Sequence, residues 1–272
     1  MIELFESDIK EENRKSSKGN QLKWKKDNIW YKADYLGYEG LAEYVISRLL
    51  TKSSLKMAEF VLYDLEEIKY KTQTFNGVKC TDFLKNKWQV ITLERLFQNF
   101  TGSSFTSAIY KIKNEEDRLS YIVEQMQRIT GLTEFGKYIN KIVTIDALFL
   151  NEDRHMHNIA VLAGPKGKYD YCPIFDNGGG LLSDTMLEYP MGTELLGILK
   201  SVRAKTFSHD FDTQLAISEQ LYGENIKFHY TQNDVNHLLD TVGNYDDEIK
   251  ERVKKIIFDR MRKYAYLFEK KI

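Results

Sequence analysis

Residues 151–158 read Asn-Glu-Asp-Arg-His-Met-His-Asn, and residues 173–178 read Pro-Ile-Phe-Asp-Asn-Gly. Asp153 and Asn158 lie five positions apart in the first stretch, and Asp176 lies in the second. Phosphoryl transfer from ATP requires such carboxylates and amide oxygens, because the protein mainly positions the reactants and stabilises charge. The two stretches therefore predict a kinase.

The three side chains suit different tasks in that reaction. A loop carboxylate free of metal can orient an acceptor hydroxyl and accept its proton, so we expect Asp153 to be catalytic. Asn158 would bind Mg²⁺ through its amide oxygen without adding a second full charge beside the phosphates, and Asp176 would supply the anionic ligand. Two protein ligands are enough, because Mg²⁺ prefers hard oxygen donors and completes its sphere with water and phosphate oxygens.

The flanking sequence predicts a scaffold for these residues. Residues 138–150 carry apolar side chains at mostly helical spacing, so we expect a buried helix that ends in the loop. Residues 159–162 and 171–175 have the pattern of strands around a Gly-Pro-Lys-Gly turn at 164–167. In this order the loop and the far end of the hairpin can converge on one metal site.

A second hairpin is predicted near the N-terminus, where strand-like residues 22–25 and 29–33 flank the turn residues 26–28. Its second strand carries Lys32. A compact charge on a long stem can reach the nonterminal phosphates of ATP from a rigid strand. We therefore expect Lys32 to have a catalytic and a cofactor-binding role.

Lys32 needs an acidic partner to orient its ammonium group. Residues 39–50 have apolar side chains along one helical stripe, and Glu39 and Glu43 lie four positions apart, on the same side of this helix. Glu43 is the first choice for the partner in the nucleotide site and Glu39 the second. The alternative is an exposed lysine and a solvated glutamate, the commoner case for an isolated pair.

The predicted phosphate loop precedes this hairpin. It contains Ser16, Ser17, Lys18, Gly19 and Asn20. Small and polar residues let the backbone approach phosphates closely, and glycine permits unusual backbone angles. The stretch is neither a GxGxxG loop nor a Walker sequence, so taken alone it fits a flexible turn better.

Two further strands are predicted at residues 59–63 and 88–93. In a two-lobed kinase the second of these would form the connection between the lobes, so we expect main-chain contacts to adenine near residues 90–96. Three glycines at 178–180 suit a mobile segment after the metal aspartate, and a plain turn explains them equally well.

The Asp-Arg-His-x-x-Asn pattern of residues 153–158, followed by an aspartate, resembles the HipA-like bacterial serine/threonine kinases. The compact CtkA-type or HipA C-terminal-domain-like members fit the length best, and the resemblance covers most of the chain. It implies Asp153 as the catalytic aspartate, Asn158 and Asp176 as magnesium ligands, and ATP and Mg²⁺ as cofactors. It also implies that His155 braces the loop.

The resemblance further implies phosphoryl transfer to Ser or Thr of a protein substrate. It raises a toxin or effector role with an antitoxin or regulatory partner. Ser16 or Ser17 would then be autophosphorylated, because some relatives are restrained by phosphorylation in the phosphate loop. The pattern departs from eukaryotic kinases, since residues 176–178 read Asp-Asn-Gly instead of Asp-Phe-Gly and no Ala-Pro-Glu follows.

Other functions stay open. A phosphoinositide-type lipid kinase would use the same residues, because those enzymes share a similar Asp-Arg-His-x-x-Asn run. A noncatalytic ATP-binding scaffold would bind nucleotide without transfer. His155 and His157 could point to one face of a strand and hold zinc or iron, but no cysteine pair or further histidine lies close by in the sequence.

Length and composition predict a folded protein with two lobes. The chain of 272 residues slightly exceeds the range in which one core normally suffices. Hydrophobic residues make up 42% and there are only three prolines, which argues against disorder. We expect an α+β, two-lobed protein-kinase-like fold, with residues 1–93 as a strand-rich N-lobe and residues 94–272 as a helical C-lobe.

Charge and targeting signals limit the partners and the location. The net charge of −1 provides no overall positive field to attract nucleic acid. Cys80 and Cys172 do not make a disulfide framework, and we find no secretory signal and no apolar run near the ~20 residues of a membrane span. We expect a cytoplasmic protein without a transmembrane segment. Secretion as an effector stays open, because CtkA-type relatives can act outside the producing cell.

Overall fold

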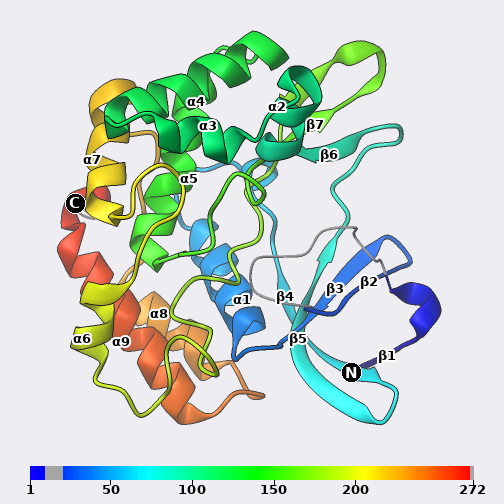
Figure 1. The fold of residues 1–272 in the computed structure, drawn as a ribbon. Helices are drawn as coiled ribbons and strands as arrows, with labels where there is room; N and C mark the ends of the chain where they lie inside the picture. The colour runs from blue at the N-terminus through cyan, green and yellow to red at the C-terminus, as the bar shows by residue number, and fades with distance from the viewer. Residues whose placement is uncertain (10–20, 270–272) are drawn as a thin grey trace. The chain divides into compact units, whose positions relative to one another are not determined.

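The computed structural model describes residues 1–9 and 21–269 (Figure 1). By their contacts they fall into two compact units. The first unit comprises Met1–Phe83, Asp176–Ser201 and Phe228–Ile272, and the second comprises Leu84–Phe175 and Val202–Lys227. The units interleave along the chain, so each is held together by segments that are distant in sequence. The division into lobes at residues 93 and 94 stays a prediction.

The first unit contains a five-stranded sheet with the strand order β1-β4-β5-β3-β2. β1 runs parallel to β4, and the other neighbours are antiparallel. One face carries a buried hydrophobic cluster that includes Trp24, Tyr31 and Ile68. The strands are β1 (Ile2–Leu4), β2 (Lys23–Lys26), β3 (Ile29–Ala33), β4 (Asp64–Tyr70) and β5 (Gln73–Thr81).

The β2–β3 hairpin forms where the sequence predicted it. Asp27 and Asn28 both have positive φ angles, 49° and 64°, as the favoured two-residue hairpin turn requires. Asp and Asn adopt this conformation more readily than other non-glycine residues. The register pairs Lys32 with Lys23 on one side and with Val78 of β5 on the other, so Lys32 lies within the sheet.

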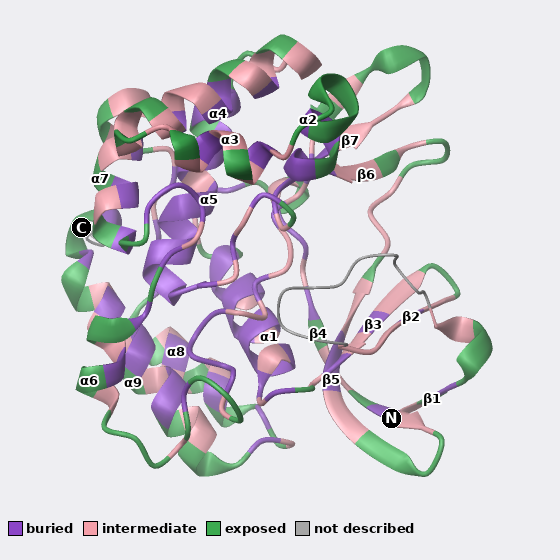
Figure 2. Cartoon of the chain, in the orientation of Figure 1, coloured by how far each residue is buried: buried purple, intermediate pink, exposed green. Residues whose placement is uncertain are grey.

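Helix α1 (Glu39–Leu50) contacts β3, β4 and β5 of this sheet. Its apolar stripe of Leu41, Val45 and Leu49 is buried, as the periodicity predicted. Figure 2 shows this helix as largely buried. Burial of one stripe against the sheet holds α1 in place, because hydrophobic burial is the main favourable term in packing.

The predicted strand at residues 59–63 is wrong. Met57–Glu59 form a 3₁₀ helix, and the next strand, β4, begins only at Asp64. The N–H of Tyr63 donates to Ser47 Oγ on α1 at 3.1 Å instead of joining a strand ladder. A side chain from a distant helix therefore replaces the strand partner that the local pattern suggested.

The remaining α-helices of the first unit lie in its second and third segments, and its 3₁₀ helices lie in the first and third. The α-helices are α6 (Leu195–Ser201), α8 (Gln232–Asp240) and α9 (Asp247–Lys263), with 3₁₀ helices at Glu6–Asp8, Met57–Glu59 and Ala265–Leu267. A capping box between Thr231 and Asp234 begins α8 and satisfies backbone donors at its first turn. α9 buries Val253, Ile256 and Ile257, so its apolar stripe is a core face.

The second unit contains a three-stranded antiparallel sheet in the order β6-β7-β8. The strands are β6 (Gln89–Thr92), β7 (Ala160–Ala163) and β8 (Tyr169–Tyr171), with a 3₁₀ helix at Pro165–Gly167. β8 ends at Tyr171, so only the first residue of the predicted strand 171–175 lies in this strand. Pro173 follows closely, and proline has no N–H to donate to a ladder.

Helices form most of the rest of the second unit. They are α2 (Leu93–Thr101), α3 (Phe105–Lys111), α4 (Glu115–Thr130), α5 (Phe135–Phe149) and α7 (Phe211–Tyr222). α5 is buried along almost its whole length (Figure 2), as predicted for the helix before the loop. Nowhere in residues 1–9 and 21–269 is there a helix long and apolar enough to cross a membrane.

Candidate active site

The first group of predicted site residues is an ion cluster in the first unit. Lys32 Nζ on β3 lies 2.7 Å from Glu43 Oε1 on α1 and 2.9 Å from Asp176 Oδ1. The lysine side chain is 12% exposed and the glutamate side chain 2%. We call Lys32, Glu43 and Asp176 the lysine cluster. The structure thus pairs Lys32 with Glu43, the partner that the sequence favoured.

Burial and charge oppose one another at Lys32. Burial alone would lower the pKa of Lys32, but Asp176 and Glu43 outweigh it and hold that pKa well above its ordinary value. The ammonium also lies 5.3 Å from the ring centroid of Tyr63. Burial, together with the charge of Glu43, raises the pKa of the Tyr63 hydroxyl well above its ordinary value. At neutral pH Lys32 is therefore a cation and Tyr63 a neutral neighbour.

The backbone around Asp176 is held in an uncommon conformation. Asp176 has a φ angle of 60°, in the left-handed region, which few non-glycine residues adopt. The N–H of the next residue, Asn177, donates to Glu43 Oε2 at 2.9 Å. Glu43 therefore binds both Lys32 and the main chain next to Asp176, and this joins three distant segments of the sequence.

Glu39, the second choice as the lysine partner, has a different role. Its carboxylate accepts hydrogen bonds from the N–H groups of Tyr35, Leu36 and Gly37 at 3.2, 2.7 and 3.1 Å. The Glu39 carboxylate thus accepts three backbone hydrogen bonds, and these bonds stabilise the turn that leads into α1. Helical spacing could not separate Glu39 from Glu43, because both lie on the same side of the helix.

The second group of predicted site residues lies in the second unit, in residues 151–159, which we call the catalytic loop. α5 ends at Leu150, whose φ angle of 54° turns the chain out of the helix. At the other end, Ile159 O accepts the N–H of Leu93 at 2.9 Å, and Met156 O accepts the N–H of Glu94 at 3.0 Å. The loop is thus anchored at both ends, by α5 and by the start of α2.

Asp153 and Asn158 meet inside this loop. Asn158 Nδ2 donates to Asp153 O at 2.8 Å and to Asp153 Oδ2 at 3.1 Å. His155 Nε2 lies 3.6 Å from Asp153 Oδ1, and His155 Nδ1 accepts the N–H of His157 at 3.2 Å. The Asp153 side chain is 15% exposed. It is restrained from two sides and retains some access to solvent.

A buried ion pair supports the catalytic loop. Arg154 Nε lies 3.1 Å from both carboxylate oxygens of Asp146 on α5, and the two side chains are 2% and 1% exposed. Arg154 Nη1 donates to Asn158 O at 3.0 Å and to Phe175 O at 2.7 Å. Phe175 precedes Asp176 in the chain. Arg154 thus holds the main chain at both of the stretches that predicted a kinase.

The environment of Asp146 is unusual for a carboxylate. Burial raises the pKa of Asp146 to about 6, although the Arg154 guanidinium acts to lower it. Sequence reasoning assigned no role to Asp146 or to Arg154. The signal was present, since an aspartate in a helix with strongly apolar neighbours is rarely buried without a partner.

Several predicted site residues lie outside the described residues. They are Ser16, Ser17, Lys18, Gly19 and Asn20 of the predicted phosphate loop. Of the other predicted residues, the structure brings Lys32, Glu43 and Asp176 together in one cluster. It brings Asp153 and Asn158 together in another.

The donors at the two predicted metal ligands suit Mg²⁺. The Asn158 amide nitrogen donates to Asp153 O and Oδ2, so the amide oxygen would be the atom that coordinates a metal. The Asp176 side chain is 25% exposed, so its carboxylate is accessible. Carboxylate and amide oxygens are the hard donors that Mg²⁺ prefers. In the described part of the chain, no three or more His, Cys, Asp and Glu side chains are grouped to hold a metal ion.

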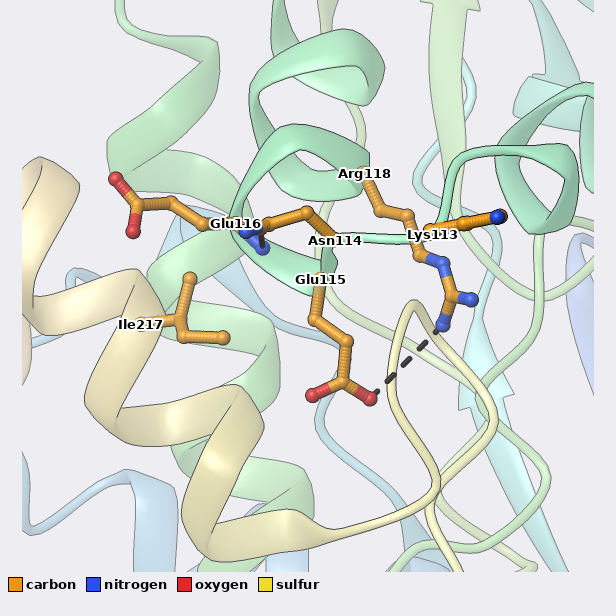
Figure 3. Close-up of a pocket in the computed structure, with 6 residues that line it drawn as sticks. All are labelled: Lys113, Asn114, Glu115, Glu116, Arg118 and Ile217. Carbon is orange, nitrogen blue, oxygen red and sulfur yellow. Dashed lines mark hydrogen bonds and ion pairs between the residues drawn. The ribbon is translucent and has the colours of Figure 1, made fainter.

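A surface hollow of about 470 Å³ lies elsewhere in the second unit, at the start of α4 (Figure 3). Its lining includes Asn114, Glu115, Arg118 and Ile217. Figure 3 shows the ion pair between Arg118 and Glu115, whose atoms are 3.9 Å apart. None of the predicted site residues that the structure describes lines this hollow, so it does not bear on the chemistry above.

Comparisons with known proteins identify a similar fold. No protein-family model matches the chain. No curated protein sequence matches it either. The crystal structure of the Helicobacter pylori proinflammatory kinase CtkA is similar with a TM-score of 0.67 and 16% identity, over 98% of this chain and 96% of that chain.

A second structure is more distant. HipA of a Shewanella oneidensis toxin–antitoxin system, solved with HipB and operator DNA, has a TM-score of 0.38 and 10% identity, over 88% of this chain and 59% of that one. The CtkA similarity spans nearly the whole of both chains and confirms the fold that the sequence predicted. This chain has an α+β, kinase-like fold similar to that of CtkA.

Proposed function

We propose that this protein transfers the terminal phosphoryl group of Mg-ATP to a serine or threonine hydroxyl of a protein. The observation that carries the proposal is the lysine cluster. A buried strand lysine lies 2.7 Å from a helix glutamate and 2.9 Å from the aspartate that follows the hairpin, on a fold similar to that of a kinase. Phosphoryl transfer requires a fixed cation of this kind near the nucleotide phosphates.

Lys32 would bind the nonterminal phosphates of the nucleotide. Its raised pKa keeps it charged, and Glu43 directs the ammonium, because a lysine held by a buried carboxylate loses few further conformations on binding. Glu43 also holds the Asn177 N–H, so the position of Lys32 is linked to the main chain beside Asp176. Asn158 and Asp176 would hold the magnesium ion, which when bound would neutralise charge on the phosphate oxygens.

Asp153 would orient the acceptor hydroxyl and accept its proton. Its Oδ2 accepts the Asn158 Nδ2–H, and its Oδ1 lies near His155 Nε2, so the carboxylate has one preferred orientation. A base on a restrained loop keeps the hydroxyl aligned for transfer, and general base catalysis typically contributes about 10²–10⁴-fold to the rate. The buried Asp146–Arg154 pair would preserve this geometry by fixing the main chain of the loop.

The test is phosphoryl transfer from radiolabelled ATP with Mg²⁺, to the protein itself and to a mixture of protein acceptors. We expect transfer by the wild type and its loss in Asp153→Asn and in Lys32→Met. Asp240→Asn is the matched control, because Asp240 is exposed at the end of α8. Wild-type protein that binds Mg-ATP but transfers no label would support the noncatalytic scaffold instead.

The acceptor is tested by a second comparison. Phosphatidylinositol vesicles offered in place of protein acceptors separate a lipid kinase from a protein kinase, because both would use the same residues. We expect label on protein and none on lipid. Mass spectrometry of the incubated protein would report whether Ser16 or Ser17 is modified, and modification of neither would contradict autophosphorylation there. A toxin role with an antitoxin partner follows only if a target in cells is found.

A further inference from the structure

The β3–α1 linker, residues 34–38, joins the strand that carries Lys32 to the helix that carries Glu43. It also binds the chain that follows Asp176. Leu36 O accepts the N–H groups of Thr185 and Met186, both at 3.0 Å. All these segments belong to the first unit. The linker is therefore connected to all three segments that carry the lysine cluster.

Tyr38 and Gly37 extend these contacts. The N–H of Tyr38 donates to Ser183 O at 3.1 Å, and its hydroxyl donates to Leu181 O at 2.7 Å. A Cβ added to Gly37 would overlap Ser183 O, so only glycine allows so close an approach of the two main chains. A shift of the linker would consequently move residues 181–186 as well as the ends of β3 and α1.

Asp34 anchors the linker at its first residue. Its N–H donates to Asn76 O on β5 at 2.8 Å, and its Oδ1 accepts the N–H of Gly40 at 2.5 Å. Its Oδ2 accepts the hydroxyl of Tyr245 at 2.8 Å. Tyr245 lies between α8 and α9, so the anchor reaches the linker from the far end of the sequence. A Cβ on Gly40 would come within 2.8 Å of Asp34 Oδ1, which shows how closely helix and carboxyl approach.

A second contact reinforces the anchor. Asn76 Nδ2 on β5 donates to Asn244 O at 2.6 Å, and Asn244 Nδ2 lies 3.3 Å from Asn76 Oδ1. Residues 244 and 245 thus bind both β5 and the linker. The loop between α8 and α9 has no part in the proposed chemistry. Its contacts instead hold β5 and the linker.

We propose that Asp34 and Tyr245 are positioning residues for the proposed kinase reaction: their hydrogen bond anchors the β3–α1 linker and thereby sets the spacing of Lys32, Glu43 and Asp176. The proposal rests on the proposed function for its effect on activity. Its structural part, the coupling of Tyr245 to the linker and to residues 181–186, does not depend on that function.

The charge on Asp34 gives the anchor a dependence on pH. Burial raises the pKa of Asp34 to about 8, with the Glu39 carboxylate contributing in the same direction, while the Gly40 N–H and the Tyr245 hydroxyl act to lower it. Glu39 on α1 and Tyr245 are the titratable groups that face it. At neutral pH Asp34 is therefore mostly protonated. Above about pH 8 it becomes a buried anion beside Glu39, and the cost of burying this charge, together with repulsion from Glu39, would loosen the linker.

The first test uses hydrogen exchange of the full chain. Tyr245→Phe removes the hydroxyl and keeps the ring, and Tyr35→Phe, an exposed tyrosine in the same linker, is the matched control. We expect faster exchange in residues 32–43 and in residues 181–186 of Tyr245→Phe, and wild-type exchange in α4 of both variants. Faster exchange confined to residues 243–246 would overturn the proposal.

The second test measures binding of Mg-ATP by calorimetry at pH 7 and pH 9. Loss of a hydrogen bond to a carboxyl group predicts roughly tenfold weaker binding by Tyr245→Phe. Wild type should bind more weakly at pH 9 than at pH 7, whereas Asp34→Asn, which resembles the protonated carboxyl, should bind equally at both. If binding of Mg-ATP by Asp34→Asn depends on pH as it does in the wild type, the proposed role of Asp34 is wrong.

The two tests separate this proposal from the proposed function. Wild-type protein that binds no Mg-ATP would contradict the kinase, and the exchange experiment would still decide whether Tyr245 positions the lysine cluster. Wild-type protein that binds and transfers, with Tyr245→Phe unchanged in exchange and in binding, would leave the kinase intact and overturn the positioning pair.

Discussion

In the lysine cluster the buried Glu43 binds the Lys32 side chain directly, whereas in the catalytic loop the buried Arg154 binds main-chain carbonyl groups. Glu43 is 2% exposed and binds the Lys32 ammonium itself. Arg154 is 2% exposed and binds the carbonyls of Asn158 and Phe175, while its charge is balanced by Asp146 beneath the loop. The first region fixes a charge, and the second fixes a backbone shape.

The difference separates two kinds of failure. A change at Glu43 alters the electrostatic environment of Lys32, so it should affect nucleotide binding more than stability. A change at Arg154 leaves a buried carboxylate without its cation, so it should affect stability first.

The largest effect is expected at the buried pair of the catalytic loop. Arg154→Met would leave Asp146 buried and unpaired, and removing one partner of such a pair typically costs about 3–5 kcal/mol of unfolding free energy. Chemical denaturation measures this loss. Arg95→Met, an exposed arginine on α2, should change stability by less than about 0.5 kcal/mol.

A double variant sharpens that result. Asp146→Leu combined with Arg154→Met removes both charges and should recover much of the stability, because a buried ion pair can often be replaced by apolar residues. Phosphoryl transfer should stay low in the double variant, since the carbonyls of Asn158 and Phe175 still lack their donor. Recovery of activity together with stability would show that Arg154 does not shape the loop.

The second effect concerns Glu43. Glu43→Gln keeps the shape of the side chain but removes the charge opposite Lys32, and we expect kcat/KM for ATP to fall about 10–100-fold, the equivalent of one hydrogen bond to a charged group. Stability should fall much less than in Arg154→Met. Glu67→Gln on the exposed surface of β4 is the control. A larger loss of stability than of activity would show that Glu43, like Arg154, mainly supports the fold.

The third effect is the pH dependence of stability. The pKa values of Asp34 and Asp146 are raised to about 8 and about 6 from an ordinary 3.8. Both carboxyls thus bind a proton more tightly in the folded state, so the stability they contribute is present at low pH and lost as pH rises. For Asp146 the loss is complete near pH 6, and for Asp34 near pH 8.

Denaturation of wild type and Asp34→Asn between pH 5 and pH 9 measures this difference. The substitution should remove the decline between about pH 6 and pH 8, where only Asp34 contributes, and below pH 6 it should leave only the part of the decline that Asp146 causes. Parallel curves for the two proteins would contradict a buried, protonated Asp34.

The smallest effect is expected at Thr206, whose hydroxyl donates to Arg154 O at 2.8 Å. Thr206→Val keeps the volume but leaves this buried carbonyl without the donor, which should cost about 1 kcal/mol. Thr241→Val removes a similar hydrogen bond to Leu238 O at an exposed site, where water can replace it. Equal effects of the two substitutions would show that Thr206 does not support the loop.

Local patterns predicted much of the fold. The β2–β3 hairpin and α1 lie where turn residues and apolar periodicity indicated, because these signals depend on neighbours in sequence. The strand predicted at 59–63 failed for a non-local reason, since Ser47 on α1 takes up the Tyr63 N–H. Pro173 and its missing N–H shortened the strand at 171–175.

The sequence by itself determined which chemical groups are present and at what spacing: Asp153 with Asn158, the following Asp176, and a lysine on a hairpin strand. Spacing of this kind is a local property, so it can be read without a fold. Only the tertiary structure decided that Glu43 and not Glu39 binds Lys32, because the two lie on the same side of one helix. Their partners come from other segments of the chain, and packing of the helix against the sheet brings each glutamate to a different one.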